Sequence, residues 1–142
     1  MKKFVIDGSI AIKWYIPEPY SKPSLLYLDL YKQNQALLMA PDLIITEVGS
    51  VLWKKASLKE ITDEDARQIS NLFANYCPLK IYSGNKLLPT AMELSLGLNL
   101  TIYDSLYLAL AISEKATMIT ANNEIKTKTD KSPFASQVVL LK

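Results

Sequence analysis

Short, mostly apolar stretches without regular polar alternation constrain the fold of this chain more than any other feature. They occur at residues 4–6, 36–40, 79–82, 117–120 and 138–141. Strands of this kind are buried on both faces, as in a parallel sheet, whereas half-exposed strands alternate apolar and polar residues. Helix-like segments separate the stretches. The pattern therefore predicts an α/β fold, with a parallel sheet covered by helices on both faces.

The segments between the strands carry recognisable helix signals. Residues 42–58 give the clearest one, with Asp42 as the expected N-cap. Residues 62–76 open with a capping box, and residues 104–116 contain a run at 106–112 that is apolar all round, which predicts a buried helix. The expected apolar face of residues 42–58 consists of Ile44, Ile45, Val48, Val51 and Leu52. Weaker helices are expected at residues 10–16 (capped by Ser9), 24–33 and 85–97 (with Pro89 in the first turn), and residues 122–128 are expected to form a short helix or a loop.

Composition excludes several kinds of chemistry. The 142 residues are 49% hydrophobic and 21% charged, which suits one globular domain. The chain has no histidine, so Ser-His and Cys-His nucleophile pairs and histidine-ligated zinc are excluded, and Cys77 alone cannot form an internal disulfide. We expect no transmembrane helix and no signal peptide, and hence a cytoplasmic location. A net charge of +2 permits nucleic acid as a partner.

Three of the 14 acidic residues lie in positions where an ordinary solvent-exposed carboxylate is not expected. Asp7 follows the first apolar stretch, and ligands of open α/β sheets bind beyond the carboxyl ends of strands. Glu47 borders the apolar stripe of its helix, and Asp104 begins the most apolar helix. Structural alternatives remain: a turn for Asp7, an ion pair with Lys54 or another lysine for Glu47, and an N-cap for Asp104, although Thr101 could also supply that cap.

Asn122 follows residues 117–120 as Asp7 follows residues 4–6. If these two strands are neighbours, both side chains emerge at the same edge of the sheet, and two helices could carry Glu47 and Asp104 towards it. Converging carboxylates repel one another unless a cation lies among them. Mg²⁺ and Mn²⁺ prefer such oxygen ligands, and the resulting site suits phosphodiester hydrolysis by a metal-activated water.

The segments holding these residues resemble PIN-domain ribonucleases, and most closely the toxin subunits of VapBC toxin–antitoxin pairs. The resemblance rests on residues 5–9, 41–48, 100–111 and 118–122, in order and spacing. It implies a three-layer α/β/α sandwich with a central, mainly parallel sheet, built as a single PIN domain over residues 1–142. Asp7, Glu47 and Asp104 match the metal-binding acids of the family. Ser9 and Thr120 match hydroxyls that help to orient the site.

The resemblance also implies Mg²⁺ or Mn²⁺, an RNA substrate cleaved endonucleolytically, a cognate antitoxin protein, a homodimer and no membrane partner. The chain departs from the family at Asn122, where an aspartate is usual, and Glu124 could compensate for the lost charge. The expected catalytic residues are Asp7, Ser9, Glu47, Asp104, Thr120 and Asn122. The expected metal ligands are Asp7, Glu47, Asp104, Asn122 and Glu124.

Two other functions remain open. Loss of a charge at Asn122 could leave a PIN-fold module that binds RNA or an antitoxin without cleaving. A phosphoryl-transfer enzyme with Asp7 as nucleophile is disfavoured, because Ser9 stands where a phosphatase has a second aspartate. Candidates for phosphate contacts are Lys13, Lys54, Lys55, Lys126 and Lys128. Residues expected in the core or in a dimer contact are Trp14, Trp53, Tyr107 and Met118.

Overall fold

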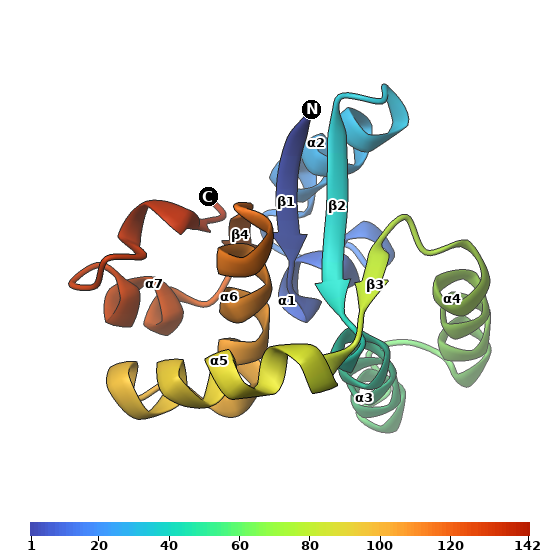
Figure 1. Ribbon diagram of the computed structural model, residues 1–142. Coiled ribbons are helices and arrows are strands. Elements are labelled where there is room, and N and C mark those ends of the chain that lie inside the picture. Colours follow the sequence, from blue (N-terminus) through green and yellow to red (C-terminus); the bar gives the residue numbers. More distant parts are fainter.

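A parallel sheet forms the centre of the molecule, which is described over residues 1–142 by a computed structural model (Figure 1). Its five strands follow the order β3-β2-β1-β4-β5, and all neighbouring pairs are parallel. They are β1 (Lys2–Ile6), β2 (Ala36–Pro41), β3 (Lys80–Tyr82), β4 (Thr117–Thr120) and β5 (Val138–Leu140). The predicted α/β class is confirmed, and each predicted strand is present.

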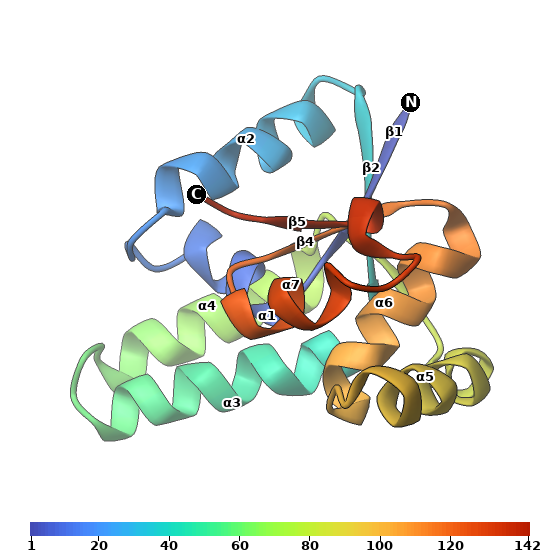
Figure 2. The same cartoon turned by 90° about the vertical axis from the view of Figure 1, so that its left-hand side faces the viewer.

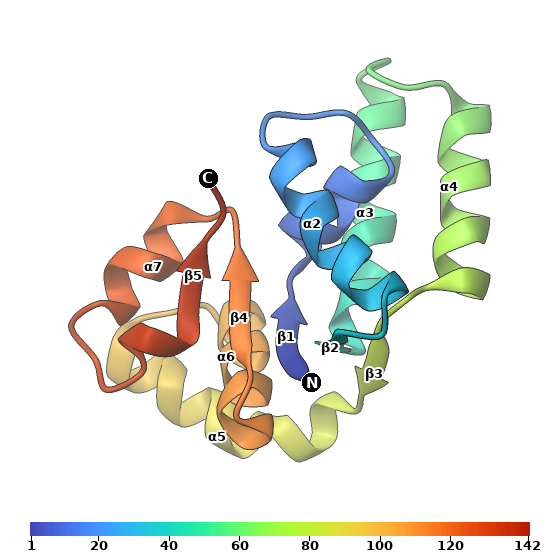
Figure 3. The ribbon, with the colours of Figure 1, turned by 90° about the horizontal axis from the view of Figure 1, so that it is seen from above.

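Helices connect the strands and cover both faces of the sheet. They are α1 (Gly8–Ala11), α2 (Ser21–Lys32), α3 (Leu43–Ser57), α4 (Asp63–Tyr76), α5 (Gly84–Leu98), α6 (Ile102–Glu114) and α7 (Asn123–Thr129), with short 3-10 turns η1 (Ile12–Trp14) and η2 (Ala135–Gln137). Figure 2 shows α2 and α6 on opposite sides of β1 and β2, and Figure 3 shows the strands from β5 at the left to β3 at the right. Figure 2 shows α3 and α4 side by side. No single helix is long and apolar enough to span a membrane.

The core is one cluster of 29 buried hydrophobic residues. As predicted, α6 is its central helix: residues 107–111 are all buried. On α3, the side chains of Ile44, Val48 and Leu52 are buried, but Ile45 is 45% exposed, so its predicted place on the apolar face is wrong. The reason is that α3 packs through a narrow ridge of residues four apart, and Ile45 lies outside that ridge.

Three predicted helix starts differ in the structure. Asp7 caps α1 in place of Ser9, because its carboxylate accepts from the backbone N–H of Ile10. Asp42 occupies the N-cap position of α3, but its Oδ1 accepts from the N–H of Gly84, 3.2 Å away, and so links α3 to α5. Pro89 lies inside α5 rather than in its first turn: the helix begins at Gly84, one residue before the predicted start, and a first turn is too short to reach Pro89 from either residue. The capping box at the start of α4 is confirmed.

Candidate active site

The predicted acids meet at one edge of the sheet. In Figure 1, β1 and β2 run towards α1 and α3, so their carboxyl ends lie at the lower side of the view. Strands β1 and β4 are parallel neighbours, which brings Asp7 and Asn122 to the same edge. A cavity of about 180 Å³ opens there, which we call the acidic cavity. Its lining consists of Asp7, Gly8, Ser9, Glu47, Asp104, Tyr107, Asn122 and Ile125.

Asp7 is the most firmly held of these acids. Its carboxylate Oδ1 accepts hydrogen bonds from the Ser9 hydroxyl (2.6 Å) and the N–H of Ile10 (3.2 Å), and Oδ2 accepts from the Thr120 hydroxyl (2.6 Å). The residue is only 6% exposed. Burial raises the pKa of Asp7 despite the three donors that favour its charged form. The two hydroxyls therefore fix both oxygens of a carboxylate that is costly to ionise without a cation.

Both hydroxyls are themselves fixed by the backbone that follows β4. The N–H of Ala121 donates to the Ser9 hydroxyl oxygen, and the N–H of Asn122 donates to that of Thr120. Each hydroxyl thus accepts one hydrogen bond and directs its own proton to Asp7. The structure places Thr120 behind Asp7 rather than in the cavity lining, so Thr120 acts on the site through its hydrogen bonds with the Asp7 carboxylate and the backbone of Asn122.

Glu47 reaches the acidic cavity from the second turn of α3. The Tyr107 hydroxyl of α6 donates to its Oε1, and no ion pair with Lys54 forms. Burial is the main reason that the pKa of Glu47 is raised, and the charges of Asp7 and Asp104 raise it further. Glu47 packs closely over Gly8: a Cβ at Gly8 would lie 3.4 Å from the Glu47 Cβ, which is an ordinary van der Waals contact.

Tyr107 is a site residue that the sequence reasoning missed. Its ring was expected in the core, and it is indeed only 1% exposed, but its hydroxyl lines the acidic cavity. The residue lies one helical turn after Asp104 on α6, so the two side chains share a face of the helix. That spacing was the only available signal, since the residue to which Tyr107 donates lies 60 positions away in the chain.

Asp104 occupies the first turn of α6 without capping it. The Thr101 hydroxyl oxygen accepts the N–H of Asp104 at 3.1 Å, so Thr101 is the N-cap and the Asp104 carboxylate is left free. Asp104 makes no ion pair. Burial raises its pKa, and the charge of Glu124 contributes in the same direction. Asp104 is half-buried, as Glu47 is, whereas Asp7 is buried.

Asn122 and Glu124 differ in their relation to the cavity. Asn122 lines it, but its Oδ1 accepts the N–H of Glu124 at 2.9 Å and caps α7. The structure does not bring Glu124 into the cavity lining. Its carboxylate pairs with Lys128 at 2.8 Å, four residues further along α7, and this contact lowers the pKa of Glu124. A compensating role for Glu124 would require that ion pair to open.

The donor set fits a hard divalent cation. Three carboxylates and one amide oxygen line the acidic cavity, and no lysine or arginine does. No three of the acids lie close enough together to enclose an ion directly. This arrangement suits Mg²⁺ or Mn²⁺, which usually takes one or two carboxylates directly and water at its other positions. Of Asp7, Glu47 and Asp104, one or two would bind such an ion directly and the remainder through water.

A parallel sheet of this order with acids at its carboxyl edge defines the class of protein. A family model described as the PIN domain matches residues 4–131, and the chain belongs to the PIN-domain family. It is homologous to VapC ribonuclease toxins of VapBC systems: ribonuclease VapC3 of Pyrobaculum aerophilum is 30% identical over 129 residues, which cover 89% of this chain and 94% of the relative. The resemblance seen in the sequence is thereby confirmed.

Solved structures agree on the fold. A toxin–antitoxin complex from Klebsiella pneumoniae contains a chain with a TM-score of 0.62 and 15% identity, over 97% of both chains. VapBC2 from Rickettsia felis, bound to a DNA fragment from its promoter, gives a TM-score of 0.63 at 18% identity, over 97% of this chain and 96% of that one. These likenesses establish the architecture, while the chemistry rests on the residues of the acidic cavity.

Proposed function

We propose that this chain is a metal-dependent endoribonuclease and the toxin of a type II toxin–antitoxin pair, acting as a single PIN domain over residues 1–142. The observation that carries the proposal is the acidic cavity, where Asp7, Glu47 and Asp104 converge without a cationic side chain. Homology to a VapC ribonuclease supports RNA as the substrate.

Each residue of the acidic cavity has a distinct task in this proposal. Bound Mg²⁺ or Mn²⁺ supplies an activated water and neutralises charge on the phosphate. Asp7 is a rigid ligand, because Ser9 and Thr120 hold both its oxygens. Glu47 is oriented by Tyr107. Asp104 is half-buried and makes no ion pair, so its carboxylate is available to a metal ion or to metal-bound water. Asn122 offers a neutral oxygen that already accepts one hydrogen bond, which favours a site of lower metal affinity than one with four acids.

Cleavage of a fluorogenic RNA by the purified protein tests the proposal. We expect cleavage with Mn²⁺ or Mg²⁺, none with EDTA, and loss of activity in both Asp7→Asn and Asp104→Asn. Asp29→Asn is the matched control, because Asp29 is exposed on α2 and makes no ion pair. Equal cleavage by Asp7→Asn and wild type would indicate a contaminating nuclease. A folded protein that binds Mn²⁺ in calorimetry but cleaves no RNA would instead favour a binding module.

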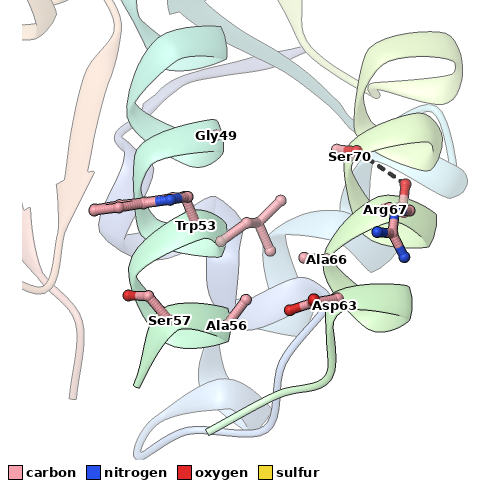
Figure 4. A pocket seen from close by; sticks show the side chains of 9 residues that line it. Gly49, Trp53, Ala56, Ser57, Asp63, Ala66, Arg67 and Ser70 are labelled. Atoms are coloured by element: carbon pink, nitrogen blue, oxygen red, sulfur yellow. Dashed lines mark hydrogen bonds between the residues drawn. The ribbon is translucent and has the colours of Figure 1, made fainter. Parts of the chain in front are cut away.

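An antitoxin partner is part of the same proposal. Relatives have been crystallised as toxin–antitoxin complexes. A groove of about 490 Å³ runs between α3 and α4 in this chain, and Figure 4 shows Ala56 and Ala66 pointing into it from the two helices. Asp63 and Arg67 lie along the α4 side. Such a groove, apolar at its floor and charged at its rim, suits one amphipathic segment of an antitoxin.

A homodimer is also proposed, and an exposed stripe on α5 supports it. Leu88, Met92 and Leu96 repeat at four-residue spacing and are all exposed, so they form one apolar line on the helix surface. Contiguous apolar surface of this kind marks interaction sites. Light scattering on the purified protein should give the mass of a dimer, and Met92→Glu should give that of a monomer. A monomeric wild type would contradict this part of the proposal.

A further inference from the structure

A second cavity adjoins the acidic cavity and carries lysines. It has a volume of about 560 Å³ and lies between η1 and α3. Ser9 lines both cavities, so the two are neighbours with a shared wall. The charged residues of its lining are Lys13, Lys54, Lys55, Glu18 and Glu60. We call it the lysine cavity, since three ammonium groups outnumber two carboxylates.

Two of these lysines are fixed by one glutamate. Glu18 pairs with Lys13 at 3.4 Å and with Lys55 at 3.0 Å, and the three side chains are only 20%, 11% and 19% exposed. Lys55 also reaches Glu60 at 3.5 Å. A long lysine side chain loses rotamer entropy when it is ordered on a ligand. Here Glu18 and Glu60 already hold Lys13 and Lys55 in place, so an anion entering the cavity need not order these two side chains.

Lys54 completes the lysine cavity as its unpaired cation. It is exposed and forms no ion pair. It follows Glu47 by two turns of α3, a rise of about 10.5 Å, and residues seven apart share a helix face. One face of α3 therefore presents a carboxylate at the acidic cavity and a free ammonium group further out. A polyanionic strand at the acidic cavity would meet positive charge on passing over Ser9.

The remaining candidate lysines are engaged elsewhere. Lys126 donates to the carbonyl of Ala135 and pairs with Asp130 at 2.9 Å. Lys128 donates to the carbonyl of Asn99 and pairs with Glu124. Both side chains connect α7 to its surroundings, and neither lines the lysine cavity. The structure thus separates the five lysines into a cluster beside the acids and a pair with structural contacts.

We infer that the lysine cavity binds a backbone phosphate of single-stranded RNA adjacent to the phosphate at the acidic cavity, with Lys54 as the direct contact and Lys13 and Lys55 as its fixed positive surroundings. The inference rests on the proposed function for the identity of the polyanion. Ammonium groups contact phosphate as point charges and read no base, so this site contributes affinity and register without sequence preference.

Binding of a labelled single-stranded RNA, measured by fluorescence anisotropy at several salt concentrations, tests the inference. The parent protein is Asp7→Asn, which removes cleavage from the measurement. Lys54→Ala should weaken binding severalfold and reduce the slope of log K against log salt by about 0.7, the value for one contact to a single strand. Lys54→Arg should retain the binding of the parent, because it keeps the charge. Alanine is favourable in helices, so α3 tolerates the change.

Lys32→Ala is the matched control. Lys32 ends α2, which leads into the amino end of β2, so it lies at the edge of the sheet opposite to the acids. Lys32→Ala removes one positive charge, as Lys54→Ala does, and should leave both the affinity for RNA and the salt slope at the values of the parent. Equal effects of Lys54→Ala and Lys32→Ala would overturn the inference, as would a parent that binds no RNA. RNA binding that depends on Lys54 in a wild type that does not cleave would uphold the inference and refute the nuclease.

Discussion

Replacing Tyr107 by phenylalanine isolates one hydrogen bond in the acidic cavity. The substitution keeps a ring that is almost fully buried and removes only the hydroxyl that donates to Glu47. No cavity is created in the core, so any loss of stability comes from the missing donor. Because that donor favours the charged form of Glu47, the variant should raise the pKa of Glu47 further.

The size of the effect follows from the charge of the acceptor. A hydrogen bond to a charged group contributes about 1.5–3 kcal/mol, and one between neutral groups about 0.5–1.5 kcal/mol. Glu47 is half-buried, so water replaces part of the lost donor and the lower end of each range applies. We therefore expect Tyr107→Phe to cost about 1.5 kcal/mol when Glu47 is ionised and about 0.5 kcal/mol when it is protonated.

Urea unfolding of the metal-free protein at about pH 8 and about pH 4 measures this difference, since these values lie on either side of an ordinary glutamate pKa. Tyr15→Phe is the control: the Tyr15 ring packs against Phe73 with centroids 5.9 Å apart, and its hydroxyl makes no hydrogen bond within the protein. It should change the free energy of unfolding little at either pH. A loss for Tyr107→Phe that equals the control, or that is larger at the lower pH, would refute the reasoning.

Three further predictions concern the same elements. Burial raises the pKa of all three carboxyl groups in the acidic cavity, so above about pH 4 the folded state holds more protons than the unfolded chain. The contribution of these groups to the free energy of unfolding therefore falls as pH rises. Urea unfolding in EDTA should show a weaker fall with pH for Asp7→Asn than for wild type. Asn122→Asp keeps the cap of α7 and adds a fourth carboxylate, so Mn²⁺ calorimetry should show tighter binding while the metal-free protein loses stability; unchanged affinity would contradict this. Leu108→Ala should lower the free energy of unfolding by about 2–5 kcal/mol, because Leu108 is 0% exposed at the centre of α6. Leu26→Ala, at an exposed position of α2 outside the proposed dimer stripe, should change it by less than about 0.5 kcal/mol.

Sequence reasoning succeeded where backbone geometry alone sets the position of a residue. Asp7 and Asn122 could be placed at one edge because each follows an apolar strand, and parallel strands present their carboxyl ends together. The freedom of Asp104 could be anticipated from Thr101, since a threonine three residues earlier can accept its N–H. These inferences need only short spacings along the chain and the direction of the strands.

Contacts between side chains far apart in the chain could not be predicted in this way. Tyr107 lies in a run that is apolar all round, where nothing local separates a ring with a functional hydroxyl from its core neighbours. Glu18 lies in the loop between η1 and α2, and nothing near it in the sequence indicates that it pairs with Lys55, 37 residues later on α3. Ile45 has the spacing of the apolar face of α3, yet it is exposed. Which side of α3 faces the core depends on the elements that pack against it, and the sequence of α3 alone does not identify them.

The place of β1 in the sheet has a consequence for how the chain is made. β1 is first in sequence but third in the sheet, between β2 and β4. A ribosome that adds about 5–20 residues per second releases β2 early, whereas β4 follows most of the chain later. Throughout that interval one edge of β1 remains open to pairing with other chains, and Asp7 lacks the Thr120 hydroxyl. When β4 pairs with β1, it closes this edge and at the same time completes the acidic cavity. A nascent chain therefore lacks the complete site until most of its fold has formed.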